Sequence, residues 1–144
     1  MLGLKSVLNV IDNTGVTRAE LINVYKVKTK AKKSVGTGTV GDMIKVVVKK
    51  SRTVTTGDNK PNTNRLRKGD MAKAVIVRCK KSEMRPDGTQ IRFDDSACVL
   101  LNNKGEMMGS RVSGPVSQAL KDVADAGVPG GRWAKILSIA PKVL

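Results

Sequence analysis

The chain has 144 residues, with 27 Lys and Arg against 12 Asp and Glu, a formal net charge of +15. This length suits one domain with a substantial core, and such an excess of positive charge predicts an anionic partner, because it repels itself in a compact fold. The absence of His excludes Ser–His and Cys–His nucleophilic pairs and His-containing zinc sites, and one Trp, one Tyr and one Phe are few for a module that stacks single-stranded bases.

The first predicted elements are two strands, Ser6 to Asp12 and Ala19 to Val27. Between them, Asp12-Asn13-Thr14-Gly15 has the residue types that tight turns require. The Gly- and Thr-rich stretch over residues 28–42 follows and contains four lysines. We expect those lysines to face water or phosphate, because no core accommodates them.

A short internal sequence similarity predicts two long strands that begin alike. Gly41-Asp42 precedes MIKVVV, and Gly69-Asp70 precedes MAKAVIV. The nearly continuous Val and Ile predict burial on both faces of each strand. Between the two copies, Ser51 to Lys68 forms a polar, basic loop that is longer than an ordinary strand connection, and such loops are usually functional or disordered.

The second half of the chain predicts two short strands and then two short helices. Gln90 to Phe93 and Ala97 to Asn102 are the strands, and apolar residues recur at helical spacing after Pro115 and again from Trp133 to Ala140. The predicted fold is mainly β: a small antiparallel β-barrel or strongly curved sheet with two short C-terminal helices. We expect one domain over residues 1–144, with the barrel and its basic loops in 1–114 and the helical portion in 115–144.

The residues disfavour several alternative chemistries. Cys79 and Cys98 match no metal-binding spacing, so we expect reduced, buried thiols, no metal and no cofactor. Asp94-Asp95 is a poor catalytic pair, because neighbouring strand residues point to opposite faces. The sequence contains no membrane-spanning run and no recognisable leader, so we expect a soluble protein with no membrane partner. We also expect no enzymatic activity, because no converging nucleophile, base and orienting group can be assembled without His.

The basic residues concentrate at predicted loops and strand ends, with few acidic residues among them. Arginine holds phosphate with a planar fork, and the scarcity of aromatic rings favours contact with the backbone and shape of folded RNA. The candidate RNA-binding residues are Lys49, Lys50, Arg52, Arg65, Arg67, Lys68, Arg78, Lys80, Lys81, Arg85 and Arg92. Arg111 is a further basic residue at such a position.

Several separate motifs carry a family resemblance. They are Arg-Pro-Asp-Gly at residues 85–88, Ile-Arg-Phe-Asp at 91–94, Ala-Cys-Val-Leu-Leu-Asn at 97–102, and Gly-Ser-Arg at 109–111 before Gly-Pro-Val. Together with SVLNVIDNTG near the start and KILSIAPKVL at the end, they make nearly the whole chain resemble the universal large-ribosomal-subunit protein L-fourteen family.

The resemblance implies a five-stranded barrel that serves as a structural constituent of the large ribosomal subunit. It implies contact of Arg78, Lys80, Lys81, Arg85 and Arg92 with large-subunit rRNA, together with neighbouring large-subunit proteins and a bridge to small-subunit rRNA. A docking surface for a ribosome-silencing factor is implied around Ser110, Arg111 and Lys135.

The chain departs from the compact bacterial pattern of that family. Ser51 to Lys68 is extended, Val123 to Arg132 looks inserted, and Cys79 and Ser96 stand where other residues are more usual. The extended loop is similar to fungal mitochondrial members and predicts a mitochondrial matrix ribosome, with a bacterial or plastid ribosome as the alternative. The alternative function is a free-standing RNA-binding chaperone.

Overall fold

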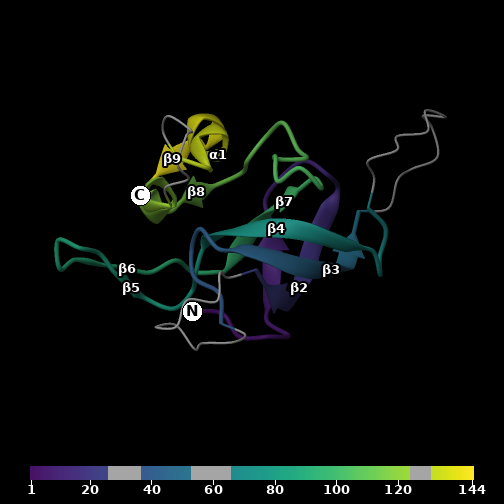
Figure 1. The fold of residues 1–144 in the computed structure, drawn as a ribbon, viewed down its shortest axis with the longest axis horizontal. Coiled ribbons are helices and arrows are strands. Elements are labelled where there is room, and N and C mark those ends of the chain that lie inside the picture. The colour runs from purple at the N-terminus through teal and green to yellow at the C-terminus, as the bar shows by residue number, and fades with distance from the viewer. Residues whose placement is uncertain (26–36, 53–65, 124–130) are drawn as a thin grey trace.

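Five strands close into a barrel in the order β1-β2-β3-β4-β7 (Figure 1). The computed structural model describes residues 1–25, 37–52, 66–123 and 131–144. Its elements are β1 (Val7–Val10), β2 (Val16–Val24), β3 (Met43–Ser51), β4 (Met71–Arg78), β5 (Glu83–Met84), β6 (Gln90–Ile91), β7 (Ala97–Leu101), β8 (Pro115–Val116), the 3-10 helix η1 (Gln118–Asp122), α1 (Ala134–Ile139) and β9 (Lys142–Val143). The predicted mainly β barrel, followed by short helical segments, is confirmed.

One pair of barrel strands runs parallel, so the barrel is mixed, where the prediction gave antiparallel strands. β1 pairs with β7 in parallel, with Asn9 opposite Ala97 and Val10 opposite Cys98. The other neighbouring pairs of the barrel are antiparallel. The reason is geometric: strand directions cannot alternate all the way around a closed ring with an odd number of members. One neighbouring pair must therefore share a direction.

The two strands that begin with Gly-Asp differ in burial. In β3, Ile44, Val46 and Val48 are buried and the residues between them are half-buried, so the predicted burial on both faces is wrong for this strand. In β4, residues 74–77 are all buried, as predicted. The difference arises because the C-terminal segment packs on this end of β4, where Ser117 N donates to Val77 O at 3.0 Å.

The two similar Gly-Asp turns have the same local structure. In each turn the Asp Oδ2 accepts a hydrogen bond from the backbone N–H three residues earlier, that of Thr39 in one copy and of Arg67 in the other, both at 2.7 Å. Gly41 and Gly69 have φ of +87° and +96°, a conformation in which a side chain is strained. Sequence similarity between the copies therefore reflects one turn used twice.

The C-terminal portion packs against the barrel through an indole and a short parallel pairing. Trp133 Nε1 donates to Gly41 O at 3.0 Å, and β8 pairs with β9 in parallel. The first of the two predicted helices is the 3-10 helix η1, whose N-cap is Ser117, and the second is α1. Leu120 of η1 and Ile136 of α1 are buried.

Cys79 and Cys98 are buried free thiols, as predicted. Burial raises the pKa of Cys98, and burial followed by the charge of Glu83 raises the pKa of Cys79 to about 12. Both thiols therefore stay protonated at neutral pH and behave as small core residues.

Candidate nucleic-acid interface

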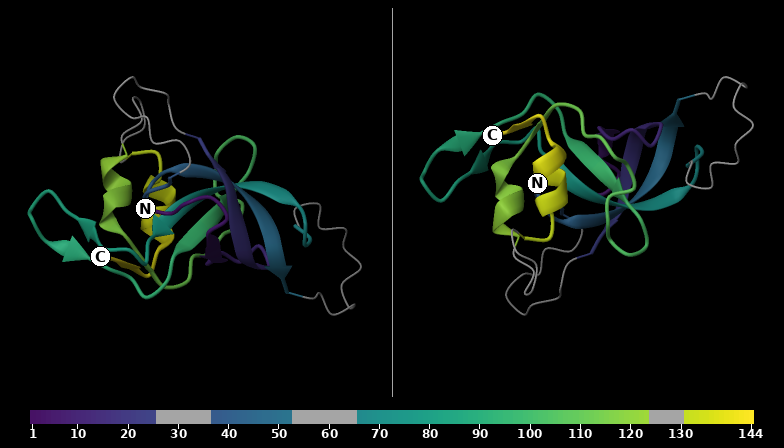
Figure 2. Two further views of the ribbon diagram at one scale, coloured as in Figure 1. Left: turned by 90° about the horizontal axis from the view of Figure 1, so that it is seen from below. Right: turned by 90° about the horizontal axis from the view of Figure 1, so that it is seen from above.

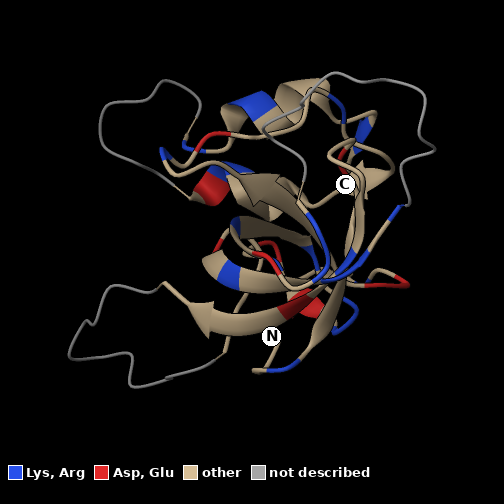
Figure 3. Cartoon of the chain, turned by 90° about the vertical axis from the view of Figure 1, so that its right-hand side faces the viewer, with Lys and Arg blue, Asp and Glu red and all other residues tan. Residues whose placement is uncertain are grey.

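The candidate RNA-binding cations that the structure describes divide between the two ends of the barrel. β3 and β4 are antiparallel, so the end of β3 and the start of β4 lie at one end, and the residues that follow β4 lie at the other. The first group is Lys49, Lys50, Arg52, Arg67 and Lys68, and the second is Lys80, Lys81, Arg85 and Arg92. All are exposed except the half-buried Arg85. Figure 3 shows Lys and Arg on strand ends and loops.

One cation of the first group lies directly opposite another cation on the neighbouring strand. Arg18, which sequence reasoning missed, lies opposite Lys50 across the β2–β3 pair. Lys49 Nζ forms a 2.7 Å salt bridge with Glu20. Like charges directly opposite each other destabilise a strand pair, so an anion at this end would relieve a repulsion that the fold carries. Only the strand register could have revealed Arg18, because it stands alone in the sequence.

The second group surrounds a hairpin that projects from the barrel (Figures 1 and 2). β5 and β6 pair through Glu83 with Ile91 and Met84 with Gln90. Gly88 closes the turn with φ of +82°, and the Asp87 carboxylate accepts hydrogen bonds from the N–H and hydroxyl of Thr89. These bonds lower the pKa of Asp87.

Two hydrogen bonds close the base of this hairpin. Lys80 N donates to Ser96 Oγ at 3.0 Å, and Phe93 N donates to Cys79 O at 3.3 Å. Both contacts join the chain entering the hairpin to the chain leaving it. Lys80 and Arg92 are thereby brought close together, although twelve positions separate them in the sequence.

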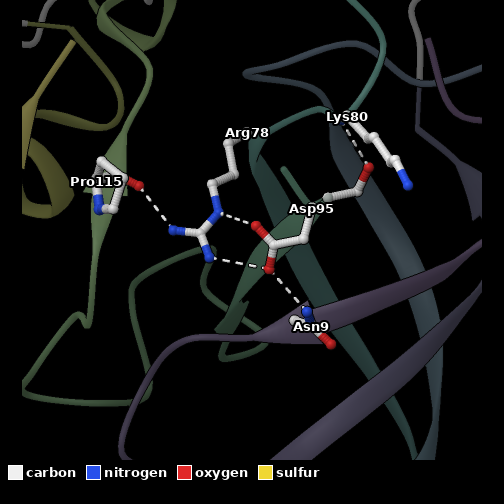
Figure 4. A network of polar contacts seen from close by, with 6 residues as sticks. Asn9, Arg78, Lys80, Asp95 and Pro115 are labelled. Atoms are coloured by element: carbon white, nitrogen blue, oxygen red, sulfur yellow. Dashed lines mark hydrogen bonds and ion pairs between the residues drawn. The ribbon is translucent and has the colours of Figure 1, made fainter. Parts of the chain in front are cut away.

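Arg78 lies apart from the other candidates, with a side chain that is 11% exposed. Its guanidinium donates from Nε to Asp95 Oδ1 at 2.8 Å, from Nη2 to Asp95 Oδ2 at 3.0 Å, and from Nη1 to Pro115 O at 3.0 Å (Figure 4). Asn9 Nδ2 also donates to Asp95 Oδ2, at 2.7 Å. Arg78 thus connects the end of β4 to the turn before β7 and to β8, and Asp95 extends the network to β1.

Burial has the largest influence on Asp95 and raises its pKa, but the hydrogen bonds from Arg78 and Asn9, together with the charge of Arg78, outweigh it and hold the pKa below its ordinary value. The carboxylate is therefore charged at neutral pH. Its neighbour Asp94 is exposed. The two carboxylates thus have different surroundings.

Ser110 and Arg111 are held by the turn that follows β1. Asn13 Oδ1 accepts hydrogen bonds from the N–H of Ser110 at 2.8 Å and of Arg111 at 3.3 Å, and Asn13 Nδ2 donates to Ser110 Oγ at 3.0 Å. Lys135, the third predicted member of this surface, is exposed on the separate element α1. In the same turn, Asp12 accepts from Leu100 N at 2.8 Å, which gives this carboxylate a structural role.

Some predicted features lie outside the described residues. They are Arg65, the four lysines of the 28–42 stretch, most of the extended loop 51–68 and residues 124–130 of the insert. Among the residues that are described, no group of three or more His, Cys, Asp or Glu is arranged to hold a metal ion. The described helices include none long and apolar enough to cross a membrane.

Comparisons with known proteins place the whole chain in one family. The family model described as Ribosomal protein L14p/L23e matches residues 1–144. The chain is 39% identical over 144 residues to the large ribosomal subunit protein uL14m of Schizosaccharomyces pombe, covering 100% of both chains. It is 38% identical over 143 residues to the protein of the same name from Neurospora crassa, covering 98% of each. The chain therefore belongs to the ribosomal protein L14p/L23e family, a family of non-enzymatic proteins of the large ribosomal subunit.

Proposed function

We propose that both basic ends of the barrel bind rRNA phosphates, so that the protein is a structural constituent of the large subunit of a mitochondrial ribosome. The observation that carries this proposal is the unpaired charge at the hairpin base. Within the described part of the chain, no salt bridge involves Lys80, Lys81 or Arg92, and all three are exposed. Phosphates would supply the missing counter-charge.

The phosphate contacts are tested by the salt dependence of binding. We compare the full chain with a Lys80→Ala/Lys81→Ala/Arg92→Ala variant for binding to large-subunit rRNA across a salt series. Each lost phosphate contact lowers the slope of log affinity against log salt by roughly 0.7–0.9, so the triple variant should lose about 2–3. A matched control, Lys104→Ala/Lys121→Ala/Lys142→Ala, removes the same charge from other exposed positions. Equal slopes for the two triple variants would refute the assignment.

The ribosomal role is distinguished from a free-standing chaperone by sedimentation. Organelle lysate is washed in high salt and separated on a gradient, and the chain is followed across the fractions. A constituent of the subunit stays in the large-subunit fraction. A chaperone instead spreads over free protein and unrelated RNA.

A second surface, formed by Ser110, Arg111 and Lys135, is proposed to face the subunit interface. There it would meet small-subunit rRNA at a bridge, or a ribosome-silencing factor. The support is that Asn13 fixes the backbone of Ser110 and Arg111 while the Arg111 side chain stays exposed. Arg111→Glu should weaken factor binding to isolated large subunits without preventing incorporation, and Lys104→Glu is the matched charge reversal. Unchanged factor affinity in Arg111→Glu would remove this surface from the proposal.

The mitochondrial location rests on the two fungal relatives and their full-length match. Subcellular fractionation with protease protection tests it directly. The chain should be recovered in the protected matrix fraction together with large-subunit rRNA. Recovery with bacterial or plastid ribosomes would replace this location with the alternative.

A further inference from the structure

A cleft lies between the β5–β6 hairpin and η1, which run beside each other in both views of Figure 2. Its volume is about 320 Å³, enough for one nucleoside and far too small for a duplex. Ile91 and Ala119 contribute apolar wall, while Glu83, Arg85 and Asp122 contribute charge. The cleft is therefore a mixed site with both hydrogen-bond acceptors and a donor fork.

Among the residues that the structure describes, two polar atoms of the cleft lack a hydrogen-bond partner. They are Glu83 Oε1 and Arg85 Nη2, and both are shielded from solvent. A buried polar atom without a partner destabilises a folded protein, so a ligand that pairs with both atoms would remove that penalty. Glu83 begins β5 and Arg85 directly follows this strand, so the two residues lie roughly 7 Å apart along the chain, and both line the cleft.

The charge distribution selects which part of an RNA can enter. The interior has Glu83 beside Arg85, and Asp87 and Asp122 also line the cleft, so a phosphate would meet more negative charge than positive. Lys81 lines an adjoining cleft that shares Glu83, Met84 and Ala119 with the first one. A nucleotide would therefore leave its phosphate beside Lys81 and insert its base between the hairpin and η1.

The donor and acceptor pattern distinguishes among the four bases. A carboxylate accepts best from a base with two adjacent N–H donors, and guanine alone has them, at N1 and N2. Guanine also offers O6 and N7 as the acceptors that an arginine fork commonly binds. Unpaired bases of folded RNA are read on these edges by proteins. We propose that the hairpin–η1 cleft binds one unpaired guanine base, with Glu83 accepting from its N1–H and N2–H and Arg85 donating to O6 and N7.

This inference rests on the proposed rRNA binding and adds a base-specific contact to it. The test uses the full ¹⁵N-labelled chain titrated separately with GMP, AMP, CMP and UMP at constant ionic strength. Because all four ligands carry the same ribose and phosphate, differences among them report the base. We expect GMP to shift amide resonances of residues 83–91 and 117–122 and to bind about tenfold more tightly than the others.

Glu83→Gln should abolish the preference for GMP, because an amide cannot accept from both donors. The matched control is Glu106→Gln, the same change at an exposed carboxylate in the turn after β7. Arg85→Lys, which removes the fork and keeps the charge, is the second test variant and should also lower the preference. Equal affinities for the four nucleotides, or a GMP preference that survives in folded Glu83→Gln, would overturn the proposal.

The failure of this inference is distinguishable from failure of the proposed function. If the chain sediments with large subunits but binds the four nucleotides equally, only the guanine site is refuted. If the chain does not sediment with large subunits at all, the ribosomal role is refuted.

Discussion

The interaction between Arg78 and Asp95 makes a prediction about stability that can be calculated from the structure. Asp95→Asn keeps the shape of the side chain but removes its charge, and it turns an N–H group toward the Arg78 fork. Arg78 then keeps Pro115 O as a partner and loses at least one of its two bonds to position 95. Its charge is left largely buried with reduced compensation.

Breaking one partner of a fully buried ion pair costs about 3–5 kcal/mol. Asp95 is 36% exposed, so solvent screens part of this loss and we expect about 2–4 kcal/mol. For a chain of this size, that lowers the Tm by roughly 6–16 °C. The control is Asp94→Asn, an identical change at an exposed neighbour, which should change stability by less than about 0.5 kcal/mol.

The assay is thermal and urea unfolding of the wild type, Asp95→Asn, Arg78→Met and the double variant. If the two side chains act as a pair, the double variant is less destabilised than the sum of the single variants by about 1–3 kcal/mol. Additive effects, or equal Tm values for Asp95→Asn and Asp94→Asn, would refute the reasoning.

The same variants decide whether Arg78 contacts RNA. With its guanidinium occupied inside the protein, Arg78→Met should leave the salt slope of rRNA binding within about 0.3 of the wild type when measured below its Tm. A slope lowered by roughly 0.7–0.9 would make Arg78 a phosphate contact.

Three further predictions concern the neighbourhood of these groups. Gly114→Ala should destabilise the fold by at least about 1 kcal/mol in thermal unfolding, because φ is +81° and a Cβ would lie 2.8 Å from Arg78 Nη1; unchanged stability contradicts this. The lowered pKa of Asp95 contributes stability that is complete above the ordinary value of 3.8 and is lost as the pH falls below it. The difference in unfolding free energy between wild type and Asp95→Asn should therefore narrow in acid unfolding below that pH. A difference that stays constant contradicts this prediction. Asn13→Ala removes the acceptor for the N–H of Ser110 and should increase amide hydrogen exchange there by at least about fivefold, with Asn103→Ala as an exposed control.

Much of the fold follows from local patterns. The Gly-Asp turns and the β-branched runs predicted the barrel strands, because turn chemistry and strand propensity act over a few residues. The direction of β1 relative to β7 did not follow in the same way, because that pairing joins segments nearly ninety positions apart. The alternation in β3 was also missed, since its hydrophobic run resembles that of β4 and only packing distinguishes the two.

The candidate site shows the same division between local and tertiary information. Composition alone identified a basic chain without histidine, and therefore an anionic partner and no histidine-dependent chemistry. It could not separate Arg78, whose fork is held by Asp95 and Pro115, from the exposed Lys80 two positions later. Nor could it pair Arg18 with Lys50.

The amino-acid sequence by itself determined the strands, the turns, the charge and the family resemblance, because these depend on residue types and short spacings. Tertiary structure decided which cations face solvent, which carboxylate neutralises Arg78, and that Glu83 and Arg85 line a cleft with η1. The physical reason is that burial and pairing depend on segments brought together by barrel closure, and a local sequence pattern does not specify which distant residue a side chain will contact.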